Sequence, residues 1–308
     1  MDKAAVGTRP KKRISEKWKD HLFGYSLMLP TFLVFSLVIL FPILKGVVMS
    51  FYNYTYATIK KGPTWNNFEN YVTIFEEGFL SQLLRTLIFT VGTVGLELII
   101  GMCIALLLNM NIRGRNAFRS LFLMSWTIPS IVTALLWSWL FNAQYGLIDY
   151  VLSRLGLISD PNMQWLQSPS LAMVTVIIAV VWRQTPYMLV MILAGLQSIN
   201  QDLVEAAAID GASVIQTFFR VKLPGIRTVL GNTIITCVMS SFQQFTIIMN
   251  MTQGGPMKMT TTMSIAAYKL AFTSRNLGAG AAIGVIWMLL LGTGVTIYNH
   301  VSRRFDYE

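Results

Sequence analysis

The stretch 205–224, Glu-Ala-Ala-Ala-Ile-Asp-Gly-Ala-Ser-Val-Ile-Gln-Thr-Phe-Phe-Arg-Val-Lys-Leu-Pro, lies between two long apolar segments of the 308-residue chain. The Ala- and acid-rich run 202–210 favours a short helix, with negative charge near the N-terminal end where the helix dipole stabilises it. Gly211 can adopt the left-handed conformation that closes a helix. The run 213–216, Ser-Val-Ile-Gln, has the spacing of a capping box that opens another helix. The pattern therefore predicts a helix, a glycine turn, and a second helix that ends before Pro224.

The second predicted helix is amphipathic. Its apolar side chains share one broad side, at Val214, Ile215, Phe218, Phe219 and Val221, while polar residues occupy the rest. One interpretation is an amphipathic helix that lies flat at the surface of a bilayer. The other is a rigid bracket of two helices that transmits force to a partner protein.

Composition places the chain among membrane proteins. Hydrophobic residues make up 54% of it, charged residues 12%, and the mean hydropathy is +0.56. A soluble domain carries about twice that share of charge. Nearly uncharged runs at 25–44, 86–108, 121–141, 170–196, 228–251 and 277–298 each reach the ~20 residues that a helix needs to cross ~30 Å of hydrocarbon. We therefore expect an all-α membrane protein with six transmembrane helices, since the alternation of a closed barrel is absent.

Lys and Arg residues are distributed unevenly about these spans. They concentrate before the first span, between the second and third, between the fourth and fifth, and after the sixth. The positive-inside rule then predicts that both termini and the bracket are cytoplasmic in a multi-pass protein of a bacterial cell membrane. The first span is too long for a signal peptide and no cleavage site follows it. The expected organisation is a cytoplasmic tail at 1–24, one transmembrane domain at 25–301 that includes a cytoplasmic loop at 198–226, and a second tail at 302–308.

Some kinds of chemistry have no support in the sequence. There is no G-x-x-x-x-G-K-[ST] motif, so any ATP that drives this protein must be hydrolysed on another chain. Cys103 and Cys237 both fall within predicted spans, which argues against a disulfide or a metal site. The net charge of +10 is explained by the cytoplasmic bias of Lys and Arg and by anionic lipid, so a nucleic acid partner is not needed. We expect a transport subunit rather than an enzyme, with no cofactor of its own.

Charged and polar residues at membrane depth are candidates for function. Glu97 and Arg183 each lie near the middle of a predicted span, and we expect a buried ion pair between them rather than two groups that face a polar cavity separately. Pro186 marks either a simple kink or the lining of a cavity. Other polar or aromatic side chains lie at similar depth: Trp126 and Ser130 in the third span, Gln184 and Tyr187 in the fourth, and Ser240, Ser241, Gln243 and Gln244 in the fifth. Such a neutral, hydrogen-bonding lining suits a sugar better than an ion.

The order of residues across 205–224 resembles the signature loop of permease subunits of binding-protein-dependent ABC importers. Glu-Ala-Ala, three residues, Gly, nine residues, an aliphatic residue, one residue and Leu-Pro follow each other, with Val221 where the family usually has Ile. The runs 193–196, Leu-Ala-Gly-Leu, and 252–256, Thr-Gln-Gly-Gly-Pro, are also similar to the carbohydrate-uptake branch of the type I importers. The similarity covers about 25–306.

The resemblance implies a type I importer permease bundle with a cytoplasmic coupling helix, and a set of partners. These are a second homologous permease, two ATP-binding subunits that hold ATP and Mg, and an extracellular solute-binding protein that delivers a sugar, expected to be an oligosaccharide. The residues implied to couple to the ATPase are Glu205 through a charged contact, Phe218 and Phe219 through a groove, and Ala206, Ala207, Gly211, Leu223 and Pro224. Those implied to contact the sugar are Trp126, Ser130, Gln184, Tyr187, Ser240, Ser241 and Gln244. Of these, Gln184, Ser240 and Ser241 depart in type from the family.

Two alternatives remain open at this point. One is an ABC importer permease for another small solute, although an anion would favour more positive charge in the bundle than Arg183 supplies. The other is a stand-alone secondary carrier or membrane enzyme, in which the bracket is only an interfacial helix. A carrier favours ion-binding carboxylates and an enzyme favours clusters of His, Asp or Glu, and the sequence shows neither.

Overall fold

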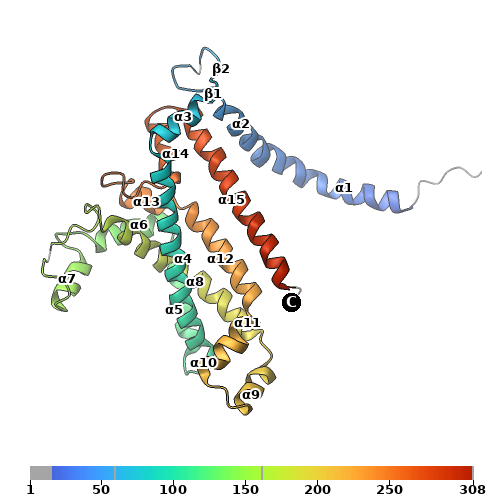
Figure 1. The fold of residues 1–308 in the computed structure, drawn as a ribbon, viewed down its shortest axis with the longest axis vertical. Coiled ribbons are helices and arrows are strands. Elements are labelled where there is room, and N and C mark those ends of the chain that lie inside the picture. Colours follow the sequence, from blue (N-terminus) through green and yellow to red (C-terminus); the bar gives the residue numbers. More distant parts are fainter. Residues whose placement is uncertain (1–15, 59, 161, 307–308) are drawn as a thin grey trace, which may run out of the picture.

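The computed structural model describes residues 16–58, 60–160 and 162–306, and most of these are helical (Figure 1). The first apolar run forms α1 (Glu16–Phe35), the π-helical turn η1 (Ser36–Leu40) and α2 (Phe41–Ser50). The other long helices are α4 (Phe79–Asn109), α8 (Ala172–Gln197), α12 (Arg227–Phe242) with α13 (Thr246–Met251), and α15 (Leu277–Asp306). Each coincides with an apolar run that predicted a span.

The third predicted span, 121–141, is not a straight helix. Its residues belong to α5 (Arg115–Thr127) and α6 (Ser130–Leu140), which meet at 98°. Ile128 and Pro129 between them are extended, because proline disfavours helical backbone in the preceding residue and has no N–H to donate. Over the described ranges, five helices are long and apolar enough to cross a membrane, and a sixth crossing requires this bent pair to count as one.

The centre of the bundle is the packing of α4 against α8. A Cβ added at Gly92 would lie 3.0 Å from Ile177 Cδ1, and one added at Gly101 would lie 2.9 Å from Met188 Cγ. Small residues allow helices to approach closely in lipid, where no hydrophobic force drives them together. Because Gly92 meets the earlier and Gly101 the later residue of α8, the two helices run in the same direction. The α5–α6 segment must therefore return the chain from one end of the bundle to the other.

Most of the short elements lie at the two ends of the bundle, whereas α7 projects to one side of it (Figure 1). One end carries β1 (Tyr52–Asn53) paired antiparallel with β2 (Thr64–Trp65), and α3 (Glu69–Glu76). α7 (Leu147–Arg154) follows α6, and α14 (Met263–Tyr268) leads through η3 (Lys269–Thr273) into α15. The opposite end carries α9 (Gln201–Ile209), α10 (Val214–Thr217), η2 (Phe218–Lys222) and α11 (Leu223–Gly225), which form the bracket.

The N-terminal helix stands apart from the rest. α1 projects away from the bundle, whereas α2 packs against α15 (Figure 1). α1 begins at Glu16, inside the stretch 1–24 that the sequence predicts as a tail. One apolar core cluster lies between α4, α8 and α12, where Met188, Leu189 and Ile192 are fully buried, and two others lie around α6 with α13 and around α14 with α15.

Candidate functional site

The first arm of the bracket begins and ends as its sequence predicts. Asn200 Oδ1 accepts a hydrogen bond from the Asp202 N–H at 3.0 Å and caps α9. At the other end Gly211 has φ +81°. The Gly211 N–H bonds the Ala208 carbonyl at 3.1 Å, and the next N–H bonds the Ala207 carbonyl at 2.9 Å, which is the Schellman pattern. The predicted glycine turn is confirmed.

The second arm starts with the predicted capping box but ends later than expected. Ser213 N–H donates to Gln216 Oε1 at 2.8 Å, and Gln216 N–H donates to Ser213 Oγ at 3.3 Å. The helix then widens, with the Leu223 N–H bonded to the Phe218 carbonyl, and continues through Pro224 to Gly225. The prediction that it ends before Pro224 is wrong. The wide turn changes the hydrogen-bond register just before Pro224, which then lies in the first turn of α11, where a proline is tolerated.

The bracket presents apolar side chains to solvent. Ile209 is 86% exposed, Val214 84% and Phe219 60%, and Ile215 is also exposed. Phe218 is half-buried against Phe219, with ring centroids 4.9 Å apart. Exposed apolar side chains gathered in one place indicate a surface that another protein or a membrane covers. The amphipathic pattern of the second arm predicted most of this surface but missed Ile209, which ends the first arm.

Two glycines anchor the bracket to the bundle. A Cβ at Gly195, near the end of α8, would lie 3.3 Å from Ile226 Cγ2 and 3.4 Å from Val229 Cγ1. A Cβ at Gly225 would lie 3.3 Å from the Ile199 side chain. Ile226 is 1% exposed. Close packing at both points means that the bracket cannot shift without moving the adjoining ends of α8 and α12.

Glu97 and Arg183 do not form the expected ion pair. Arg183 Nε donates to the Ile128 carbonyl at 3.1 Å, a carbonyl that the break between α5 and α6 leaves free of helical partners. Glu97 is fully buried, and within the described residues no ion pair reaches its carboxylate. Its electrostatic neighbour is the thiol of Cys237 on α12. The prediction is wrong because the two side chains leave their helices in different directions, one toward α12 and the other toward the bend.

Four of the seven predicted sugar-contact residues surround the bend. Trp126 lies near the end of α5 and its ring centroid is 6.0 Å from that of Tyr187 on α8. Ser130 is the first residue of α6, and Gln184 precedes Tyr187 by three positions on α8. Trp126 is exposed and the other three are half-buried, so all remain accessible to a ligand.

The other three residues lie where α12 is interrupted before α13. Ser240 is exposed, Gln244 is half-buried, and Ser241 is buried with an unpartnered hydroxyl. Ser264 of α14 donates to the Gln244 carbonyl at 2.7 Å and holds the interruption in place. Ser264 was not predicted, because nothing in the neighbouring sequence distinguishes it from other polar residues. Within the described residues no hydrogen bond or ring contact joins this group to the group at the bend.

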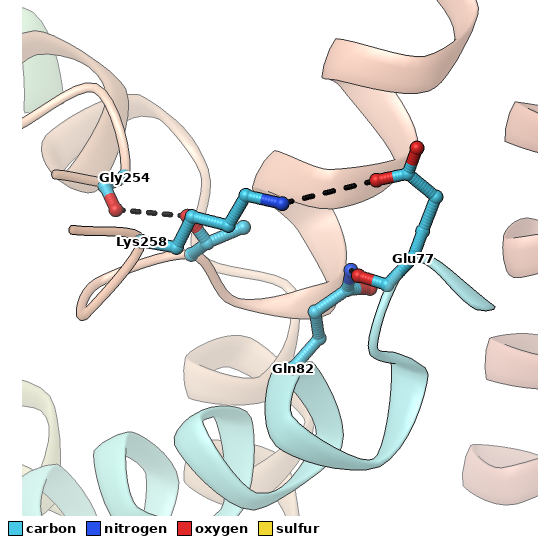
Figure 2. A network of polar contacts seen from close by, with 5 residues as sticks. Glu77, Gln82, Gly254 and Lys258 are labelled. Carbon is cyan, nitrogen blue, oxygen red and sulfur yellow. Dashed lines mark hydrogen bonds and ion pairs between the residues drawn. The ribbon is translucent and has the colours of Figure 1, made fainter. Parts of the chain in front are cut away.

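The Thr-Gln-Gly-Gly-Pro run belongs to a loop at the end opposite the bracket. Lys258 Nζ lies 3.8 Å from Glu77 Oε2, and Gln82 donates to the Glu77 carbonyl at 3.2 Å (Figure 2). Thr261 Oγ1 donates to the carbonyl of Gly254, whose φ is +83°. The ion pair is exposed and contributes little by itself. The contacts nevertheless tie this loop to the start of α4, which gives the run a structural role.

Comparison with known proteins gives consistent matches along the chain. The family described as "Binding-protein-dependent transport system inner membrane component" matches residues 97–307. The trehalose/maltose transport system permease protein MalF of Thermococcus litoralis is 34% identical over 93% of this chain and 96% of its own length. The sn-glycerol-3-phosphate transport system permease protein UgpA of Yersinia pestis is 32% identical over 92% and 95%.

A solved structure shares the fold. A chain from the crystal structure of a bacterial ABC transporter involved in the import of the acidic polysaccharide alginate superimposes with a TM-score of 0.80. The match covers 94% of this chain and 99% of that one, at 23% identity. At that identity the likeness shows the architecture and leaves the cargo to other arguments.

Proposed function

This chain belongs to the family of binding-protein-dependent transport system inner membrane components, and from that membership we propose that it is the permease of an ATP-driven importer that takes up a sugar. Its fold is that of a type I ABC importer permease, and it crosses the membrane several times. The observation that carries the proposal is the bracket. It offers exposed apolar side chains on short rigid helices and is packed directly onto α8 and α12.

The bracket would couple the bundle to a separate ATPase. An apolar surface centred on Phe219 fits a groove in the partner, and the exposed Glu205 on α9 supplies a charged contact beside it. When two ATPase subunits close on ATP, the bracket moves with them. This chain then needs no cofactor, because ATP and Mg are held on the ATPase subunits.

The central polar residues would line the path of the sugar. Gln184 and Tyr187 lie on α8, whose far end packs on the bracket through Gly195. A displacement of the bracket therefore shifts these two side chains relative to Trp126 and Ser130 at the bend. Ser240, Ser241 and Gln244 would complete the lining from α12. Hydroxyls, amides and aromatic faces match the alternating polar and apolar surface of a pyranose.

The family supports the choice of partners, and the distribution of Lys and Arg supports the orientation. We propose a second homologous permease, an extracellular binding protein that delivers the sugar, and a bracket that faces the cytoplasm together with both termini. The transmembrane domain would extend over 25–301. MalF, named for trehalose and maltose, supports a neutral saccharide as the cargo.

Arg183 favours a second candidate cargo, an anionic small solute. Only its Nε is bonded to Ile128, and over the described ranges its terminal guanidinium nitrogens have no partner. These donors suit a phosphate or carboxylate. UgpA, a relative named for sn-glycerol 3-phosphate, is consistent with an anionic cargo.

Reconstitution tests the proposal. The permease with its second permease, its ATPase and its binding protein is placed in proteoliposomes, and uptake of trehalose, maltose, maltotriose and sn-glycerol 3-phosphate is measured with and without ATP. We expect ATP-dependent and binding-protein-dependent uptake of a neutral sugar. Uptake by the permease without the ATPase would refute the importer assignment, and uptake of the phosphate ester alone would establish the anionic cargo. Truncation of both Phe218 and Phe219 to Ala should release the ATPase.

A further inference from the structure

A polar pocket lies away from the predicted sugar-contact residues, between the end of α6 and α7. Its volume is about 420 Å³, within the range of small-molecule sites. The lining includes Trp139 from α6, Gln144 and Tyr145 from the connection, and Asp149, Tyr150 and Ser153 from α7.

The buried group in this pocket is the carboxylate of Asp149, which is 3% exposed. Its Oδ1 accepts a hydrogen bond from the indole N–H of Trp165. Its Oδ2 is buried and has no partner among the described residues. A buried carboxylate oxygen without a donor is costly, so a donor from a ligand would stabilise it.

Aromatic side chains flank the carboxylate. Tyr145 is 62% exposed and Tyr150 58%, and Trp139 is also exposed. The guanidinium of Arg154 lies 5.4 Å from the centre of the Tyr150 ring, which restrains that ring. Flat apolar faces beside a hydrogen-bond acceptor suit the C–H face of a pyranose with its hydroxyls turned to the polar group. The Gln144 amide can donate and accept, as a hydroxyl does.

A chain of aromatic rings connects this pocket to the central residues. The rings of Trp182 and Trp137 are 5.8 Å apart, those of Trp137 and Phe141 5.5 Å, and those of Phe141 and Trp165 5.4 Å. Trp182 lies beside the predicted sugar contacts on α8, and Trp165 holds Asp149. α6 starts at the bend and is 11 residues long, so the pocket is about 16 Å from it along the helix. The pocket is thus held rigidly at the far end of the same helix.

We propose that this pocket is a second sugar-binding site, which holds one ring of a neutral saccharide on the extracellular side before it reaches the central residues. This inference rests on the proposed function and on its orientation. A protein docking surface would need no buried acceptor, and a metal ion would need more than the single carboxylate found here. The unpartnered Oδ2 together with exposed rings suits a ligand with both hydroxyls and an apolar face.

The test uses the complete transporter in nanodiscs, without its binding protein. Saturation-transfer NMR measures the affinity for trehalose, maltose and maltotriose in the wild type and in the variants Asp149→Asn and Tyr145→Ala. Asn keeps an acceptor for Trp165, and Tyr145 is exposed, so both variants should fold. Asp160→Asn, an exposed carboxylate of the same connection, and Tyr56→Ala, an exposed ring of another loop, are the matched controls. We expect roughly tenfold weaker binding in each test variant, on the scale of one hydrogen bond to a charged group, and no change in the controls.

Several results would overturn the site. They are unchanged affinity in both test variants, an equal loss in the controls, or no binding of the sugar that the same preparation transports. Weaker association with the sugar-free binding protein, at unchanged saccharide affinity, would instead identify a protein docking surface. Failure of the proposed function is separate, because it appears as absence of sugar uptake by the wild type.

Discussion

The substitution Gly211→Val tests the bracket as a coupling element. Gly211 has φ +81°, and no heavy atom lies within 4 Å of a Cβ built there. The substitution therefore introduces no clash, and its effect is conformational. A left-handed backbone costs an L-residue about 1–2 kcal/mol, and a β-branched residue is among the least tolerant. Asn tolerates this conformation better, so Gly211→Asn should show a smaller effect.

The strain is relieved when the glycine turn opens, which disconnects the two arms of the bracket. A cost of 1–2 kcal/mol shifts the ratio of closed to open turn by a factor of about 5–30. We expect the sugar transported per ATP hydrolysed to fall by about that factor in proteoliposomes, while membrane insertion is unchanged. The ratio is the relevant readout, because it separates loss of coupling from loss of protein.

Gly156→Val provides a matched control. Gly156 follows α7, has φ +68°, has nothing within 4 Å of its Cβ position, and closes its helix with the same two hydrogen bonds as Gly211. It should carry the same local strain without changing the transport ratio. A wild-type ratio in Gly211→Val, or an equal fall in Gly156→Val, would refute the assignment of the bracket as the coupling element.

Three further predictions concern individual side chains. Phe219→Ala should change the free energy of unfolding of the permease by less than about 0.5 kcal/mol, because the ring is exposed. It should weaken binding of the ATPase by about 2 kcal/mol or more, measured by co-purification. Full retention of the ATPase would count against docking at this ring. The effects of Glu97→Gln and Arg183→Gln on the free energy of unfolding should add to within about 0.5 kcal/mol, because the two side chains do not pair. A coupling energy near ~3 kcal/mol in the double variant would show instead that they form an ion pair. Gly280→Ala should destabilise the purified permease by about 1–3 kcal/mol, because the new Cβ would lie 2.7 Å from the Cβ of Ala271. Gly284→Ala should be nearly neutral, because no heavy atom lies within 4 Å of its Cβ position. Equal melting temperatures of the two variants would contradict this packing.

Two prolines in predicted spans have different effects on the structure, and the sequence alone did not predict which would break its helix. Pro186 and Pro129 both lie within apolar runs long enough to cross a membrane. α8 continues through Pro186, whereas the chain bends by 98° at Pro129. Local sequence does not separate a tolerated kink from a break, because the difference lies in what replaces the lost hydrogen bonds. At the bend, Arg183 donates to the freed Ile128 carbonyl from a helix 55 residues away.

Some residues of the candidate site were predicted from the sequence, and the pocket around Asp149 was not. Trp126, Gln184 and Tyr187 were predicted as sugar contacts, and the structure brings the first and last of these into ring contact. Their role in binding remains a prediction. The pocket around Asp149 could not be predicted, because it depends on a contact between distant residues: Trp165, 16 residues further along, bonds one carboxylate oxygen, and the other is buried without a partner among the described residues.

The amino-acid sequence by itself determined the membrane class, the apolar helices and the turn at Gly211. These features depend on the length of each apolar run and on hydrogen bonds between residues a few positions apart, and both can be read from the order of residues. Only the tertiary structure decided that Glu97 and Arg183 do not pair, that α5 and α6 meet at 98°, and that Ile209 joins the exposed apolar side chains of the bracket. Those outcomes depend on which helix face meets which neighbour, and contacts between distant segments are set by packing of the whole bundle rather than by any local pattern.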